Sequence, residues 1–114
     1  MPHPHDLIRF LRARYDEETA LALAASPGPW HTNDEADEVL AADGITVADG
    51  FALSGRQLRA TTQHIARYDP VRVLAEVAAK RVVLDAWDDM DYEAPWSVYD
   101  ALAAVYADHP DYPR

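Results

Sequence analysis

The sequence predicts an α+β fold: an N-terminal helix, a small antiparallel β-hairpin or three-stranded meander, and then three helices. Apolar residues recur at helical spacing over residues 7–25, and an Asp-Gly pair at 43–44 lies between alternating apolar residues. An Asp-Pro pair at 69–70 then restarts a helical pattern. At 114 residues the chain is long enough for a core but too short for two, so we expect a single domain over residues 1–114.

The first part of the chain is predicted to be a short lead followed by an amphipathic helix. Residues 1–5 are expected to form a flexible lead, and Asp6 is the expected N-cap of a helix over residues 7–25. The Ser-Pro-Gly-Pro run at 26–29 ends this helix, because proline cannot continue it. The stripe expected to face the core comprises Leu7, Ile8, Leu11, Tyr15, Ala22 and Ala25.

Residues 30–55 change to a strand pattern. Ile45 and Val47, with Val39 as a further candidate, are expected to alternate to one face, and Asp43-Gly44 suits a tight turn that requires positive φ. Residues 30–32 offer a third, short strand. A lone hairpin is marginal in water, so these strands are expected to pack on the helices.

Three helices are predicted after the strands. The helix over 70–88 should have Asp69 as its N-cap and Pro70 at its first position. Its apolar residues point nearly all round, so it should be central and covered on more than one side. A last helix should run from 95 or 96 to 106, and residues 107–114 should form an extended tail. The expected inward residues are Leu58, Thr61 or Thr62, Ile65 and Tyr68 in the helix over 55–68, and Val98, Tyr99, Leu102, Val105 and Tyr106 in the last helix.

Composition excludes several classes of function. The chain has no cysteine, so disulfides, thiolate metal sites and a cysteine nucleophile are excluded. A net charge of -10 disfavours direct binding to nucleic acid or anionic lipid, unless a local basic surface is used. No apolar run approaches the roughly 20 residues of a membrane span, and no secretion signal is evident. We therefore expect no membrane association and a cytoplasmic location.

The charges are unevenly distributed along the chain. Residues 30–55 hold six carboxylates and no base, whereas residues 56–81 hold six bases and two acids. The simpler expectation is that these opposite charges lie side by side in one small domain as exposed pairs. The alternative is a two-faced molecule that offers its acidic surfaces to a basic partner.

Candidate site residues are few, since the chain has no nucleophile elbow, P-loop or zincin motif. Two histidines and two carboxylates could bind a divalent metal or relay a proton, provided that the C-terminal tail returns to the Asp69 corner. The alternative is that both residues are structural, with His64 on the flank of its helix and Asp69 as a helix cap. No cofactor is predicted. The metal candidates are His64, Asp69, Asp108 and His109, and Arg67, Arg72 and Trp30 are further candidate binding residues.

Four stretches carry a resemblance to a known family. They are Leu7-Ile8-x-Phe10-Leu11-x-Ala13-Arg14, Gly28-Pro29-Trp30, the run from His64 to Arg81, and Tyr106-Ala107-Asp108-His109-Pro110-Asp111-Tyr112. In these stretches the chain resembles a family of short actinobacterial and actinophage proteins catalogued only as a domain of unknown function. Position 68 is commonly histidine in that family. If the family uses that histidine as a ligand or base, Tyr68 counts against a shared metal site. The resemblance implies a cytoplasmic protein of a high-GC actinobacterium or its mobile elements, and brings no activity, cofactor or catalytic residue.

The sequence favours a non-enzymatic interaction module, a small acidic accessory protein that binds another protein. The charge layout and the missing catalytic motifs support this reading, and a basic partner and a homodimer are both compatible with it. The alternative is a metal-assisted enzyme or small-ligand binder that uses His64, Asp69, Asp108 and His109.

Overall fold

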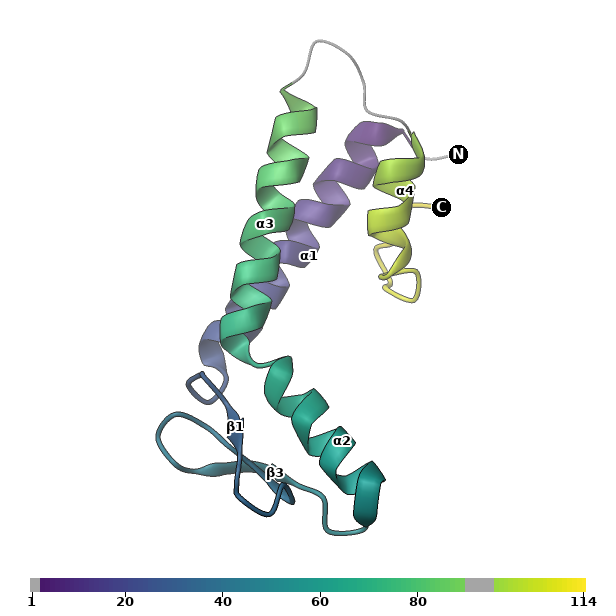
Figure 1. Cartoon of the computed structure of the whole chain (residues 1–114). Helices are drawn as coiled ribbons and strands as arrows, with labels where there is room; N and C mark the ends of the chain where they lie inside the picture. The colour runs from purple at the N-terminus through teal and green to yellow at the C-terminus, as the bar shows by residue number, and fades with distance from the viewer. Residues whose placement is uncertain (1–2, 90–95) are drawn as a thin grey trace. The chain divides into compact units, whose positions relative to one another are not determined.

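A computed structural model describes residues 3–89 and 96–114 (Figure 1). In chain order the elements are α1 (Pro4–Ala24), β1 (His31–Thr32), β2 (Glu38–Leu40), β3 (Thr46–Asp49), α2 (Gly55–Arg67), α3 (Pro70–Asp88) and α4 (Trp96–Ala104). The predicted α+β fold is confirmed, with a three-stranded antiparallel sheet in the order β1-β2-β3. No helix among the described residues is long and apolar enough to cross a membrane.

The chain divides into two compact units. The helical unit comprises Met1–Glu18 and Val77–Arg114, and the sheet unit comprises Thr19–Glu76. α1 and α3 each contribute to both units. The expectation of a single domain over residues 1–114 stays a prediction, and each unit is described by itself below.

In the helical unit, α1 begins earlier than predicted. The backbone N–H groups of Asp6 and Leu7 both donate to the carbonyl of His3, at 2.9 and 3.3 Å. Pro4 suits the first helical turn because its φ is already helical and its missing N–H would have no partner there. Asp6 therefore lies inside the first turn and is not the N-cap, and Pro4 and His5 are helical instead of part of a flexible lead.

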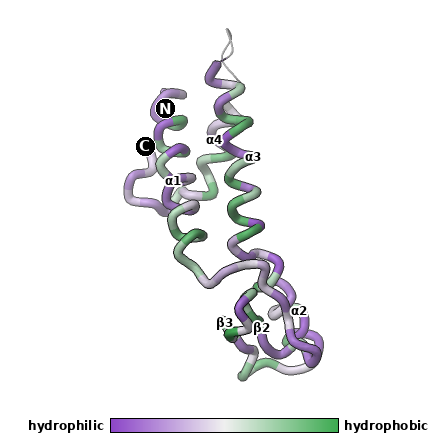
Figure 2. The backbone as a smooth tube through the Cα atoms, turned by 90° about the vertical axis from the view of Figure 1, so that its left-hand side faces the viewer, coloured by the Kyte–Doolittle hydropathy of each residue, from purple (hydrophilic) through white to green (hydrophobic). Residues whose placement is uncertain are grey.

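The core of the helical unit follows the first part of the predicted stripe of α1, whereas Ala25, expected on the same stripe, lies beyond the end of α1 and is exposed. Leu7, Leu11 and Tyr15 are fully buried, as are Leu84 of α3 and Ala103 of α4. Apolar and polar residues alternate along α3, as Figure 2 shows, but the predicted cover of this helix is incomplete. Val82 and Val83 of α3 are exposed, as is Val71 at the α3 end that belongs to the sheet unit. Val105 lies beyond the end of α4 and is exposed, which corrects its predicted inward position.

The C-terminal segment turns where an extended tail was predicted. Successive backbone hydrogen bonds, from His109 N–H to the Tyr106 carbonyl (2.8 Å) and from Tyr112 N–H to the His109 carbonyl (3.0 Å), fold residues 106–112 into consecutive turns. The rings of Tyr106, His109 and Tyr112 each make a T-shaped contact with the ring of Phe10, with centroids 5.5–6.0 Å apart. Aromatic contact with α1 thus explains why the segment folds back.

In the sheet unit, the predicted hairpin forms around residues 41–45. Gly44 adopts φ 84°, and Ala41 N–H donates to the Ile45 carbonyl at 2.9 Å. The register shifts between Val39 and Leu40, because Val47 forms a bulge. Ile45 therefore lies in the turn and is exposed, which corrects its expected place on the buried face.

α2 packs its inner face against the sheet. The Thr62 hydroxyl is buried and donates to the carbonyl of Ala36 at 2.7 Å, while Leu58 and Ile65 are half-buried on the same face. Tyr68 lies just beyond the last helical residue and is exposed, contrary to its predicted inward position. The boundaries of α3 are as predicted.

Candidate functional site

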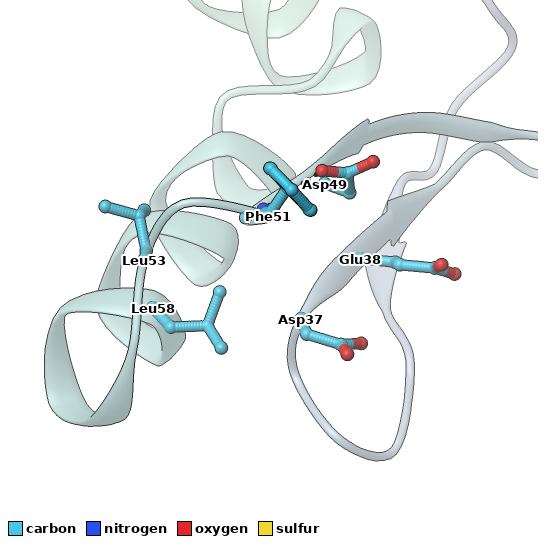
Figure 3. A pocket seen from close by; sticks show the side chains of 7 residues that line it. Asp37, Glu38, Asp49, Phe51, Leu53 and Leu58 are labelled. Carbon is cyan, nitrogen blue, oxygen red and sulfur yellow. Dashed lines mark hydrogen bonds between the residues drawn. The ribbon is translucent and has the colours of Figure 1, made fainter.

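The sheet unit carries a pocket of about 340 Å³ between the ends of β2 and β3 and the start of α2 (Figure 3). We call it the acidic pocket. Glu38 comes from β2, Asp49 from β3 and Asp37 from the loop before β2. The apolar residues come from the loop after β3 and from α2 (Figure 3). The lining residues are Asp37, Glu38, Asp49, Gly50, Phe51, Leu53 and Leu58.

Local hydrogen bonds fix the loop that shapes the acidic pocket. Gly50 N–H donates to the Asp37 carbonyl at 2.9 Å, and Phe51 N–H donates to the Asp49 carboxylate at 3.0 Å. Gly50 also permits a close approach, since a side-chain carbon there would collide with Leu58. The loop is therefore held against α2, and Phe51 follows directly after this constrained glycine.

Two carboxylates of the acidic pocket belong to paired positions of neighbouring strands. Glu38 of β2 pairs directly with Asp49 of β3 in the antiparallel register. Directly opposed residues project from the same face of a sheet, and like charges in such a pair destabilise it. Neither carboxylate forms an ion pair with any residue that the structure describes. Like charges at paired strand positions are unfavourable as a rule, and a positive group nearby would lessen that effect.

Phe51 supplies an apolar surface beside these carboxylates. Its side chain is 97% exposed, the most exposed of the large hydrophobic residues in the described chain. Leu53 and Leu58 are half-buried and line the same pocket. An exposed aromatic ring beside an apolar floor is the kind of surface that contributes strongly to protein interfaces.

The opposite face of α2 is basic. Helical spacing places its polar residues on the side away from Leu58, Thr62 and Ile65, and all of these polar residues are exposed. This surface, the basic face of α2, comprises Arg56, Arg59, Gln63, His64 and Arg67.

The basic face of α2 does not pair with the carboxylates of residues 30–55. Ion pairs do form elsewhere, between Arg12 and Asp88 (2.9 Å) and between Arg72 and Glu76 (2.8 Å), for example. Within residues 3–89 and 96–114, however, neither the three arginines of the basic face nor the six carboxylates of residues 30–55 take part in one. The simpler expectation of internal pairing is therefore wrong for these two segments.

Two sequence-predicted binding residues form a row with Tyr68 at the end of α2. The centre of the His64 ring lies 4.7 Å from the centre of the Tyr68 ring. The Arg72 guanidinium lies over the same Tyr68 ring, 4.6 Å from its centre. The hydrogen bond from Arg72 Nε to Glu76 raises the pKa of Arg72 above its ordinary value. A shallow cavity of about 230 Å³ next to this row is lined by Ala60, Gln63, His64, Arg67 and Tyr68.

Asp69 and Trp30 meet, but their contact is structural. Asp69 is buried, with one oxygen accepting the Arg72 backbone N–H (2.9 Å) and the other accepting the Trp30 backbone N–H (2.9 Å). The Trp30 indole N–H donates to the Ser26 carbonyl at 3.0 Å. The predicted N-cap is confirmed, and both carboxylate oxygens of Asp69 are occupied by backbone groups.

His109 is also held by structural contacts, within the helical unit. Its Nδ1 lies 2.8 Å from Nη1 of the buried Arg14 and accepts the Asp111 N–H at 3.0 Å. Arg14 was not singled out in the sequence, although a charged residue one helical turn beyond Phe10 interrupts an otherwise apolar stripe. Asp108 is exposed.

The four metal candidates are divided between the two units, and their use as one site stays a prediction. His64 and Asp69 belong to the sheet unit, whereas Asp108 and His109 belong to the helical unit. Throughout the described part of the chain, no three histidine, aspartate or glutamate side chains gather in a way that could hold a metal ion. The residues of the acidic pocket, in contrast, were missed as a site, although the run Asp49-Gly50-Phe51 after a predicted strand could have indicated an exposed aromatic loop.

The fold and these surfaces define a small α+β protein with separated acidic and basic faces. A family model described as a family of unknown function, DUF6221, matches residues 4–114, and the chain belongs to this family. No curated protein and no solved structure matches the chain.

Proposed function

We propose that this protein is a non-enzymatic interaction module that binds a partner protein through the acidic pocket. The observation that carries the proposal is the pairing of Glu38 with Asp49 in the strand register, an arrangement of like charges that a positive group would relieve. Sites that bind a ligand often retain interactions that lower the stability of the free protein. The pocket therefore suits a basic side chain.

Arginine fits the pocket better than lysine. Its planar guanidinium can donate to two carboxylates at once, and it is less strongly hydrated than an ammonium group. Its aliphatic stem would lie along Phe51 and Leu58, which line the same pocket. The proposed partner segment therefore carries exposed arginine, whose aliphatic stem would cover the apolar lining.

The proposal extends to the source of the protein. The resemblance noted in the sequence supports an origin in a high-GC actinobacterium, its phage or another mobile element. The cytoplasm is the compartment that we propose for it, in keeping with the composition of the chain.

A peptide titration followed by NMR would test the proposed function. A short peptide of alternating arginine and leucine should shift the amide signals of Glu38, Asp49 and Phe51, and a glutamate–leucine peptide should not. Phe51→Ser and Glu38→Gln should each weaken binding about two- to tenfold. Asp34→Asn removes an exposed carboxylate outside the pocket and is the matched control. Amide shifts confined to other surfaces, or equal loss in the control, would contradict the proposal.

A further inference from the structure

The basic face of α2 and the acidic pocket are complementary surfaces of the same sheet unit. The basic face of α2 has three exposed arginines, Arg56, Arg59 and Arg67, that form no ion pair with any described residue. The acidic pocket has three carboxylates that likewise form no ion pair within the described residues. We propose that the basic face of α2 binds the acidic pocket of a second copy of this chain. The inference rests on the proposed function and names its partner.

The placement of the two surfaces explains why they meet between copies. Leu58 projects from α2 into the pocket, whereas Arg59 and Arg67 lie on the side of the helix that faces away from the sheet. None of these arginines lines the pocket of its own copy, which lies on the other side of the helix. A neighbouring copy can present the basic face directly, so the contact is head-to-tail, and it produces short chains or a closed ring.

The charges on both surfaces are free to form this contact. No ion pair within the described residues has to break first, and the opposed Glu38 and Asp49 would gain a positive neighbour. Copies with a net charge of -10 repel each other at long range, but this repulsion is screened beyond about 8 Å at physiological ionic strength. Association should therefore be measurable near 0.15 M salt and weaken towards about 1 M salt.

A charge-swap experiment tests the contact by sedimentation equilibrium. One variant, R59E/R67E, makes α2 acidic, and the other, D37R/E38R, makes the pocket basic. Each variant alone should associate at least about tenfold more weakly than the unaltered protein, because like charges then face each other. An equimolar mixture should recover association, since the acidic helix of one variant meets the basic pocket of the other. The neutral variant R59Q/R67Q should be intermediate, and circular dichroism melting checks that each variant folds.

Several outcomes would overturn the inference. The first is a protein that stays monomeric at every concentration up to about 1 mM near 0.15 M salt. The second is association that is unchanged by both charge reversals. The third is an equimolar mixture that stays dissociated although both variants fold. The arginine–leucine peptide separates this failure from a failure of the proposed function. If the peptide binds the pocket while the protein stays monomeric, the partner is another protein and only the second-copy contact is wrong. If the peptide does not bind the pocket, the proposed function is wrong as well.

Discussion

Replacement of Glu38 by glutamine should stabilise the free protein. The substitution keeps the length of the side chain and the strand pairing but removes the charge that faces Asp49. Opposed like charges on paired strands cost about 0.2–1 kcal/mol, and two unit charges about 5 Å apart in water repel by about 0.8 kcal/mol. We therefore expect a gain of about 0.5 kcal/mol in the free energy of unfolding.

Thermal melting followed by circular dichroism can resolve this gain. For a protein of this size, about 0.5 kcal/mol corresponds to a rise in Tm of roughly 2–4 °C. The rise should shrink at about 1 M salt, because the repulsion it relieves is then screened. Asp34→Asn lowers the net negative charge equally without a facing strand residue, so it measures the general relief of self-repulsion.

The same substitution should weaken the binding of the arginine–leucine peptide. Stability and affinity are then predicted to change in opposite directions, as expected when an unfavourable contact is kept for binding. An equal rise in Tm for Asp34→Asn would refute the reasoning, because the effect would not depend on Asp49. A fall in Tm for Glu38→Gln would refute it more directly.

Three further predictions concern the structural residues. Asp69→Ala should lower the free energy of unfolding by about 2–4 kcal/mol in a urea titration, since it removes an N-cap and leaves a backbone N–H unpaired, and Asp69→Asn should cost less. His109→Leu should cost about 1–3 kcal/mol in the same titration because the buried Arg14 loses an acceptor, and His109→Asn should recover part of this loss. Burial, followed by the hydrogen bond to Glu18, raises the pKa of Tyr106 above its ordinary value of 10.0, so the folded state holds this proton more tightly than the unfolded state. The stability from this proton is present below pH 10.0 and is lost as pH rises above it, so the Tm of Tyr106→Phe should fall less steeply with alkaline pH than that of the unaltered protein.

The elements that the sequence predicted correctly are those that depend on local chemistry. Asp69 and Pro70 define the start of α3 within two residues, and Gly44 satisfies a positive φ that its own turn requires. Such signals act between neighbours in the chain, so they can be read without the tertiary structure. The end of α1 before the Ser-Pro-Gly-Pro run follows the same logic.

The predictions that failed depend on contacts between distant segments. Ile45 was expected on the buried face because alternation was assumed to continue, but the bulge at Val47 interrupts it. The C-terminal segment has no strong local signal for its turns, and the ring of Phe10, about a hundred residues earlier, is what holds it. The cross-strand pairing of Glu38 with Asp49 was likewise hidden, because register is set by the whole hairpin.

Structural roles now account for the residues that first looked most chemical. Asp69 uses both oxygens on backbone groups, and His109 uses Nδ1 on Arg14 and on a backbone N–H, so neither needs a ligand to explain its position. Phe51 and Glu38 have no such role among the described residues: the Phe51 ring is exposed, and the Glu38 carboxylate forms no ion pair, although Asp49 does accept the Phe51 backbone N–H. Side chains that lack internal partners can bind a ligand without first breaking a hydrogen bond, whereas polar atoms that are already hydrogen-bonded cannot. By that criterion, the pocket at the start of α2 is where the function of this protein should be sought.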